Sequence, residues 1–327
     1  MPTWKATACS CSNIALIKYW GNTDEVQRLP ANGSISMNLD TLMTRTSVEF
    51  RDDLASDHVT LDDKTVSGAA LGRISRHLDH FRKLAGITTF AAVESSNNFP
   101  AGAGIASSAS GFAALTVAAA ASLGLKLSER ELSSLARLGS GSAARSIPAG
   151  FVEWYPGSTH EASYAASIAA PEHWDVVDLV AIISQGHKTT GSTEGHALAG
   201  TSVLQQARVA SAPGRIAACR EAILNRDFAT LASVVEMDSN IMHAVMMTSV
   251  PALFYWEPET IAIMAAVRAW RAEGLSVCYT IDAGPNVHCL CTVADADAIT
   301  QELDGMPGIL EVRRGGPGRG AYVESVE

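Results

Sequence analysis

Glycine and serine are concentrated in the stretch "NNFPAGAGIASSASGFAAL", which runs from Asn97 to Leu115. A strand-like segment precedes this stretch and its second half is helix-like, so a loop of small residues leads into a helix N-terminus. Gly102 and Gly104 let a ligand approach the backbone, and the free N–H groups and positive dipole of a helix start suit a phosphate. The loop has neither the lysine of a P-loop nor the spacing of a dinucleotide fingerprint. Spacing alone therefore leaves a phosphate site and a tight packing turn both open.

Two cations lie in patterns that could contact an anion. The turn "GSGSAARS", from Gly139 to Ser146, carries Arg145, whose guanidinium matches two oxygens of a carboxylate or phosphate. An ordinary helix start with a surface arginine would have the same pattern. Lys18 lies in the run "NIALIKYWG", where its side chain either extends to the surface or points into a site.

The motif "YTIDAGPN" places Asp282 at the end of a β-rich run and at the start of a Gly-Pro turn. Aspartate in a turn usually bonds to its own backbone, but a carboxylate at the end of a rigid strand also suits a general base. The polar segment "HKTTGSTEG" contains Lys188 and Ser192 and is either a substrate loop or a linker.

The composition limits the partners and the location that we expect. The chain has 327 residues, 47% hydrophobic and 18% charged, with a formal net charge of −10. This acidity disfavours nucleic acid or an anionic membrane as the main partner. The longest apolar run, Phe112 to Leu125, has 14 residues, fewer than the about 20 that cross a bilayer. We expect no secretory leader, and six cysteines without zinc-type spacing favour buried thiols in a reducing cytoplasm.

The elements that position these residues are expected to form about two domains. Alternation predicts strands over residues 4–12 and 44–50, with turns and short strands between them. The sequence "SERE" from Ser128 predicts a capping box, and "DAGPN" predicts a turn between two strands. Residues 309–323 predict a final hairpin. The expected domains span two ranges, 1–184 and 185–327.

These motifs occur in the order typical of one enzyme family. The segments "NIALIKYWG", "NNFPAGAGIASSASGFAAL", "GSGSAARS…GFVEW", "GSTEG" and "YTIDAGPN" resemble those of mevalonate diphosphate decarboxylases, in the GHMP kinase superfamily. The resemblance extends from Ala8 to about Asn286. It implies an α+β, GHMP-kinase-like fold in which an N-terminal α/β domain holds the phosphate loop and a C-terminal domain is ferredoxin-like. The active site would lie between them.

The resemblance also implies a reaction. Members of this family use ATP and Mg²⁺ to phosphorylate the tertiary 3-hydroxyl of 5-diphosphomevalonate, and loss of phosphate and CO₂ then gives isopentenyl diphosphate for isoprenoid biosynthesis. Phosphate leaves a tertiary carbon readily, and loss of CO₂ next to it quenches the positive charge that develops. The implied partner is a small phosphorylated mevalonate, and the implied assembly is a cytoplasmic homodimer.

The family motif assigns a role to each candidate residue. Asp282 matches the catalytic carboxylate that orients or deprotonates the 3-hydroxyl, Lys18 would lower the pKa of Asp282, and Arg145 would hold the substrate carboxylate. The expected substrate-binding residues are Asn13, Tyr19, Asn22, Ser140, Gly141, Ser142 and Ser192. The expected ATP-binding residues are Ala101, Gly102, Ala103, Gly104, Ile105, Ala106, Ser107 and Ser108. Ser107 or Ser108 would also face the metal.

The chain departs from the family pattern where the 5-substituent is expected. Asn22 replaces a lysine that would serve the substrate's diphosphate. This change leaves open a substrate with one phosphate fewer, 5-phosphomevalonate giving isopentenyl phosphate, unless Arg73 or Arg76 supplies the missing charge. The other departures are Cys11, Ala31 and His196.

Other activities fit the sequence less well. A 3-kinase that stops after phosphorylation is an alternative, but the joint presence of Asp282, Lys18 and Arg145 favours the full reaction. A serine hydrolase would need a G-x-S-x-G motif, which this sequence lacks. A non-catalytic binding homologue would not need the inferred catalytic residues.

Overall fold

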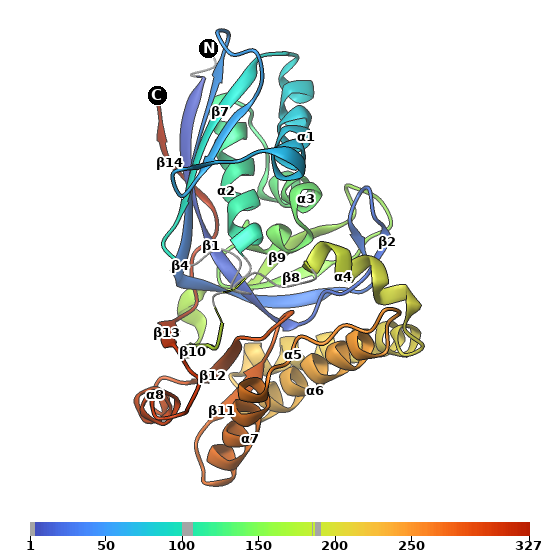
Figure 1. Ribbon diagram of the computed structural model, residues 1–327, viewed down its shortest axis with the longest axis vertical. Coiled ribbons are helices and arrows are strands. Elements are labelled where there is room, and N and C mark those ends of the chain that lie inside the picture. The colour runs from blue at the N-terminus through green and yellow to red at the C-terminus, as the bar shows by residue number, and fades with distance from the viewer. Residues whose placement is uncertain (1–3, 100–106, 185, 187–190) are drawn as a thin grey trace.

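The chain folds around two sheets, one in each half of the molecule (Figure 1). The computed structural model describes residues 4–99, 107–184, 186 and 191–327. The strands of the first sheet are β1 (Lys5–Ile17), β4 (Ser34–Arg51), β5 (His58–Leu61), β6 (Lys64–Thr65), β7 (Phe90–Asn97), β8 (Phe151–Tyr155), β9 (Tyr164–Ala169) and β14 (Tyr322–Val326). The strands of the second sheet are β10 (Val176–Ile182), β11 (Val277–Thr280), β12 (Val287–Thr292) and β13 (Glu311–Gly315). A separate hairpin is formed by β2 (Asn22–Asp24) and β3 (Leu29–Pro30).

Helices connect these strands. The α-helices in the described residues are α1 (Gly68–Ala85), α2 (Ser107–Ser122), α3 (Glu129–Gly139), α4 (Ser192–Leu198), α5 (Gln205–Asn225), α6 (Phe228–Met247), α7 (Pro258–Ala272) and α8 (Ala296–Asp304). They cover one face of the first sheet, whereas the second sheet packs against α5 and α6 on one face and against α7 and α8 on the other. The 3₁₀ helices there are η1 (Gly141–Ser146), η2 (Pro171–His173) and η3 (Ala199–Thr201). None of these α-helices is both long and apolar enough to cross a bilayer.

The first sheet is built on the long antiparallel pair of β1 and β4. The start of β4 pairs with β8 and the rest with β7, so one strand joins two parts of the sheet. The turns and short strands that we expected before residue 44 are confirmed in part, because β2 and β3 form a short hairpin around a turn. The prediction is wrong on either side of this hairpin, because β1 continues to Ile17 and β4 begins at Ser34. Ser34, Ser36 and Asn38 have turn-like residue types, but these polar side chains are buried in the strand.

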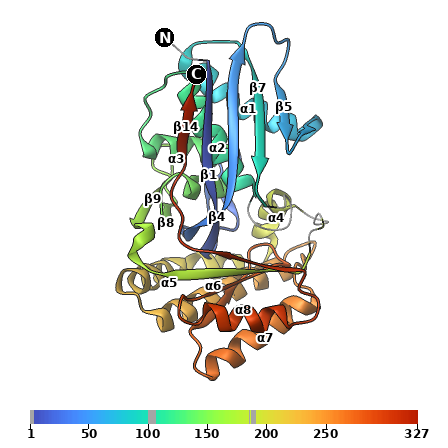
Figure 2. The same cartoon turned by 90° about the vertical axis from the view of Figure 1, so that its left-hand side faces the viewer.

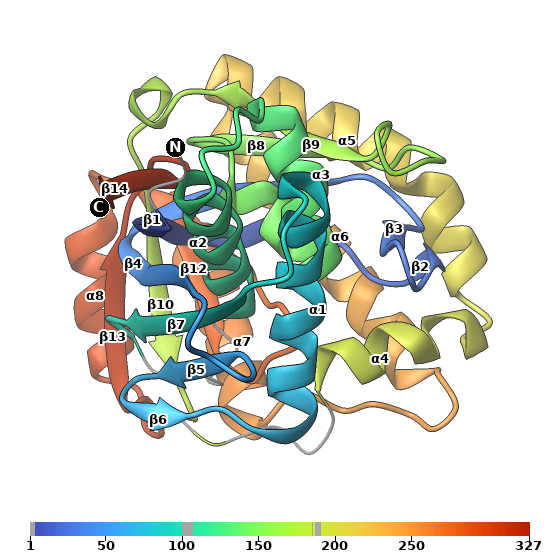
Figure 3. The same ribbon diagram turned by 90° about the horizontal axis from the view of Figure 1, so that it is seen from above.

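The helix that follows the predicted phosphate loop is buried against the sheet. Alanine is frequent in α2, and its small side chains allow the helix to lie close to β1 and β4, with α3 and α1 beyond it (Figure 3). The predicted capping box starts α3 and is confirmed. The Glu131 N–H donates to Ser128 Oγ over 3.3 Å, and the Ser128 N–H donates to the Glu131 carboxylate over 2.8 Å.

The second sheet has the strand order β11-β12-β10-β13, with all neighbours antiparallel. Its connections follow the β-α-β-β-α-β pattern of a ferredoxin-like fold, which confirms the predicted fold class. The "DAGPN" turn joins β11 to β12 as expected. Figure 2 shows this sheet and its helices below the ends of β1 and β4.

Two segments near the predicted domain limits pair differently from the expectation. The hairpin predicted over residues 309–323 is wrong, because β13 pairs with β10 whereas β14 pairs with β1 in the other sheet. β10 lies in the second sheet although it precedes residue 185. The boundary after residue 184 stays a prediction, and three strand pairings cross it, namely β1 with β14, β10 with β12 and β10 with β13. Local sequence patterns cannot show pairing between strands this far apart.

The packing of α3 on α2 can be tested at Gly139. A Cβ at this position would lie 2.1 Å from Phe112 Cδ1, so Gly139→Ala forces the ring or the helix end to move. We expect the free energy of unfolding in urea to fall by about 1–3 kcal/mol. Gly214→Ala is the control, because nothing lies within 4 Å of its Cβ position and alanine favours a helix interior. Equal stability of the two variants would contradict this packing.

Candidate active site

An ammonium–carboxylate pair joins the two halves of the molecule. Lys18 follows directly after β1, and Asp282 lies just beyond the end of β11. Lys18 Nζ donates to Asp282 Oδ1 over 2.6 Å and to the Ala15 carbonyl over 2.8 Å. The Lys18 side chain is 1% exposed, whereas that of Asp282 is 26% exposed. The Asp282 carboxylate is therefore bonded to a buried cation, and part of its surface remains accessible to a ligand.

The charges around Asp282 keep it ionised. Burial on its own would raise the pKa of Asp282, but the ammonium of Lys18, followed by the charges of His288 and Arg145, holds that pKa below its ordinary value. Burial lowers the pKa of Lys18, and the Asp282 carboxylate opposes this shift. At neutral pH the site thus offers a carboxylate that accepts a hydrogen bond or a proton.

The backbone of Lys18 is fixed on both sides by buried polar groups. Its N–H donates to Asp238 Oδ2 over 2.6 Å, and Arg215 Nε donates to the other oxygen of Asp238 over 2.6 Å. Its carbonyl accepts from Arg208 over 2.7 Å and from Asn32 over 3.0 Å. Our sequence interpretation missed these four residues, because no local spacing connects them to Lys18.

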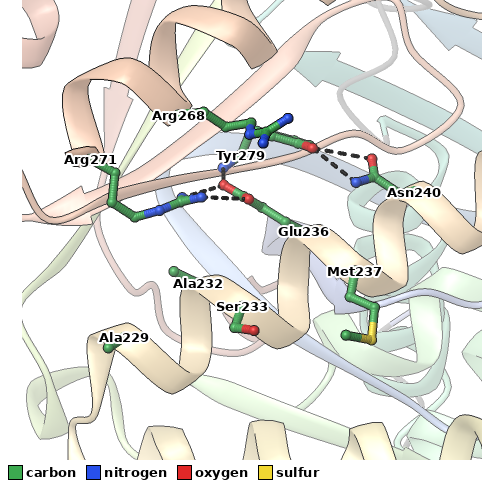
Figure 4. A pocket seen from close by; sticks show the side chains of 9 residues that line it. All are labelled: Ala229, Ala232, Ser233, Glu236, Met237, Asn240, Arg268, Arg271 and Tyr279. Carbon is green, nitrogen blue, oxygen red and sulfur yellow. Dashed lines mark hydrogen bonds and ion pairs between the residues drawn. The ribbon is translucent and has the colours of Figure 1, made fainter.

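The strand before Asp282 is held by the same helix that binds Lys18. Ser239, next to Asp238 in α6, accepts from the Ile281 N–H over 3.1 Å. On the outer face of α6, Glu236 pairs with Arg271 over 2.5 and 2.8 Å and accepts from the Tyr279 N–H over 3.3 Å (Figure 4). These contacts lie in a cavity of about 520 Å³ between α6, α7 and β11. α6 therefore fixes the positions of both charged residues.

Arg145 is a buried cation beside this pair. It lies in η1, is 2% exposed, and donates to Ser34 Oγ over 2.7 Å and to Asn13 Oδ1 over 3.3 Å. Burial lowers the pKa of Arg145 to about 10. Its Nε has no hydrogen-bond partner among the described residues, and no carboxylate there forms an ion pair with it. A buried guanidinium without a counter-charge suits an anionic ligand.

The predicted Gly/Ser turn packs against Tyr19. A Cβ on Gly141 would lie 2.5 Å from the Tyr19 ring, so only glycine permits this close contact. The Tyr19 hydroxyl donates to Asn22 Oδ1 over 2.5 Å, and the His196 ring stacks on Tyr19 with centroids 4.2 Å apart. Asn13 donates to the Ser142 carbonyl over 3.2 Å. The structure therefore places Gly141 and Asn22 against Tyr19, and Asn13 against the neighbouring Ser142.

The predicted nucleotide residues are described only in part. Residues 101–106 and Lys188 lie outside the described residues, whereas Ser107 and Ser108 begin α2. Ser108 Oγ lies 3.2 Å from Ser140 Oγ, which connects the helix start to the Gly/Ser turn. A cavity of about 220 Å³ adjoins this helix start. Its lining is mostly apolar and includes Val59, Ile74, Val93, Asn97, Phe112 and Leu115.

Ser192 is the one predicted substrate residue that the described structure leaves apart from the others. It is the exposed first residue of α4 and forms no hydrogen bond with the other predicted site residues that the structure describes. The segment before it, residues 187–190, lies outside the described residues.

Two family models match the chain. A model described as "Diphosphomevalonate decarboxylase-like N-terminal domain" matches residues 10–165, and one described as "Mevalonate 5-diphosphate decarboxylase C-terminal domain" matches residues 178–308. The fold and site thus define a decarboxylase-type member of the GHMP superfamily.

Curated relatives and solved structures agree with these matches. A diphosphomevalonate decarboxylase of Ganoderma lucidum is 38% identical, with 88% of this chain and 78% of the relative covered. A phosphomevalonate decarboxylase of Haloferax volcanii is 35% identical, with 91% and 92% covered. A structure described as "MDDEF in complex with MVAPP, AMPPCP and Magnesium" is 36% identical, with a TM-score of 0.93 and 98% of each chain covered. This chain belongs to the diphosphomevalonate decarboxylase family.

The effect of Lys18 on Asp282 can be measured directly. Lys18→Met removes the charge that lowers the pKa of Asp282 most, whereas the burial that raises this pKa remains. We therefore expect the Asp282 carboxyl to titrate above its ordinary value of 3.8 instead of below it. The titration is followed by NMR of ¹³C-carboxyl aspartate. Asp53, whose pKa is lowered by exposed Arg51, serves as an internal control that should not change. An unchanged Asp282 titration would contradict the proposed electrostatic coupling.

Proposed function

We propose that this protein is an ATP-dependent decarboxylase that converts 5-diphosphomevalonate into isopentenyl diphosphate, ADP, phosphate and CO₂. The observation that carries this proposal is the pair of the buried Lys18 and the partly exposed Asp282, with Arg145 beside it, a cation that has no carboxylate partner among the described residues. The family membership and the relatives named above support the same reaction.

Asp282 is the group that acts on the 3-hydroxyl of the substrate. Its ionised carboxylate accepts the hydroxyl proton as the oxygen attacks the γ-phosphate of ATP. Lys18 keeps the carboxylate ionised and stabilises negative charge on the oxygens that react. Because both backbones are held by α6, the acceptor has a fixed position relative to the bound hydroxyl.

Arg145 holds the substrate carboxylate, with Asn13 and Ser34 fixing its guanidinium. The 3-phosphate leaves with the electrons of its bond to C3, and the bond between the carboxylate carbon and C2 breaks to form the new double bond. Tyr19 and residues Ser140, Gly141 and Ser142 line the carbon chain between these groups. Ser192, the first residue of α4, is a further substrate contact in this proposal.

ATP binds at the start of α2, with its phosphates along residues 101–108. The helix N-terminus and the Ser107 and Ser108 hydroxyls suit phosphate oxygens, and the adjoining 220 Å³ apolar cavity suits the adenine ring. Serine hydroxyls are also hard oxygen ligands, which fit Mg²⁺. When bound, the metal neutralises charge on the β- and γ-phosphates.

The same chemistry on 5-phosphomevalonate is the second candidate function. It is favoured by Asn22, which lacks the expected charge, and by the similarity to the Haloferax volcanii enzyme. Arg73 could supply the charge that Asn22 lacks. It donates to the Gly139 carbonyl over 2.7 Å and so lies next to Ser140, one of the predicted substrate-binding residues. A coupled ADP assay with parallel CO₂ detection on mevalonate, 5-phosphomevalonate and 5-diphosphomevalonate separates these functions. ADP release without CO₂ would instead reveal a 3-kinase.

The setting of the enzyme is also a proposal. The family resemblance supports a cytoplasmic homodimer. The six cysteines are free and buried, as expected for a protein that folds in a reducing compartment.

The role of Asp282 is tested by Asp282→Asn, which keeps the shape and removes the proton acceptor. We expect ADP and CO₂ release to fall by at least about 1,000-fold, within the range that general base and electrostatic effects jointly supply. Calorimetry should show ATP and substrate still binding. Asp304→Asn, in an exposed position at the end of α8, is the matched control with unchanged turnover. Near-normal CO₂ release by Asp282→Asn would rule out the role given to this residue.

A further inference from the structure

Two arginines converge on the last carbonyl groups of α3. Arg28 Nε donates to the Leu138 carbonyl over 3.2 Å, and Arg73 donates from Nε and Nη2 to the Gly139 carbonyl over 3.0 and 2.7 Å. The two acceptors are neighbouring peptide groups, so the guanidinium groups lie close to each other. Each guanidinium has five N–H donors, and most of them remain for a further partner.

These two arginines lack a carboxylate partner among the described residues. Burial, and then the charges of Arg28 and Arg76, lower the pKa of Arg73 to about 10. Like charges held together at a half-buried position destabilise the free protein, and a bound anion relieves their repulsion.

Tyr19 connects these arginines to the catalytic residues. Its ring contacts Gly141, and its hydroxyl bonds to Asn22 at the start of the β2–β3 hairpin that carries Arg28. The charges of Arg28 and Arg145 both act on this hydroxyl. A substrate whose carboxylate binds Arg145 can therefore extend along Tyr19 toward Arg28.

Asn22 offers no charge, and both ends of its amide are already bonded. Its Oδ1 accepts from the tyrosine hydroxyl over 2.5 Å, and its Nδ2 donates to the exposed Glu25 carboxylate over 2.8 Å. The charge near this position comes from Arg28, whose backbone is fixed in the β2–β3 hairpin. Arg137 donates to the Gln27 carbonyl, and Arg28 itself has a left-handed backbone with φ of 50°.

We propose that Arg28 is the residue with which this chain recognises the second phosphate of a 5-diphosphate substrate. Arg28 and Arg73 bind the terminal phosphate together. Arg28 thus provides the positive charge that a lysine at position 22 would otherwise provide. This inference rests on the proposed function, because it names the preferred substrate of that site. It makes 5-diphosphomevalonate preferred over 5-phosphomevalonate.

The first test compares Arg28→Gln with the wild type on both substrates. We expect kcat/KM for the diphosphate to fall at least about 10-fold, as for the loss of a charged hydrogen bond. The value for the monophosphate should change less than about 3-fold, because this substrate lacks the phosphate that Arg28 binds and only a weak, longer-range charge effect is lost. Adding Asn22→Lys to Arg28→Gln should restore the preference for the diphosphate. Equal losses on both substrates, or no loss on either, would overturn the assignment.

A matched control removes the same charge elsewhere. Arg226→Gln changes an exposed arginine that also has a left-handed backbone, with φ of 56°, at the end of α5. Both kcat/KM values should stay at the wild-type level. A change in substrate preference in this variant would show that net charge, and not Arg28, sets the preference.

Calorimetry with inorganic pyrophosphate and inorganic phosphate tests Arg28 without turnover. We expect the wild type to bind pyrophosphate more tightly than phosphate and Arg28→Gln to lose most of that difference. If the wild type releases no CO₂ from either substrate, the proposed function is wrong. The calorimetric titration still shows whether Arg28 binds the second phosphate. Equal pyrophosphate affinity of the wild type and Arg28→Gln rejects the assignment whatever the activity.

Discussion

A contact between a buried ammonium and a partly exposed carboxylate is the interaction on which this site depends. Lys18 extends from the first sheet and Asp282 from the second, and their charged atoms lie 2.6 Å apart. Each charge would be unfavourable in this position without the other. The two halves of the molecule must therefore keep their relative position for the pair to form. α6 enforces this by binding the backbone at Lys18 through Asp238 and the backbone at Ile281 through Ser239.

The distribution of cations explains how an acidic chain can bind an acidic substrate. The formal net charge is −10, yet Lys18, Arg145, Arg28 and Arg73 are gathered around η1 and the end of α3. Apart from the Lys18–Asp282 pair, these cations donate to carbonyls and neutral side chains. Their charges remain available for a carboxylate and phosphates. Phosphoryl transfer depends mainly on positioning and charge stabilisation, which this arrangement supplies.

The sequence predicted the parts of the fold that depend on neighbouring residues. The capping box at Ser128 and the turn after Asp282 depend on contacts within a few residues, and both are confirmed. The prediction of a final hairpin was wrong because β13 and β14 each pair with a strand far away in the chain. The first part of β4 was missed because Ser34, Ser36 and Asn38 are buried in the strand, against the usual preference of these residue types for turns.

The site was predictable as a set of motifs but not as a geometry. Residue types left the orientation of Lys18 open, and the structure directs it to Asp282. Asp238 and Arg208 could not be found from spacing, because they contact Lys18 from 220 and 190 residues away. Substrate contact by Asn22 stays a prediction, and the structure shows its amide bonded to Tyr19 and Glu25. The proposal that Arg28 provides the charge missing at position 22 depends on the β2–β3 hairpin, which the sequence alone did not reveal.

The most direct test of the central claim is a double-mutant cycle on the rate of ADP formation in a single turnover. It compares Lys18→Met, Asp282→Asn and the double variant with the wild type. If the buried pair acts as one unit, the double variant should be about as slow as the slower single variant. A double variant whose loss equals the product of the two single losses would show that the residues act independently and would contradict this account.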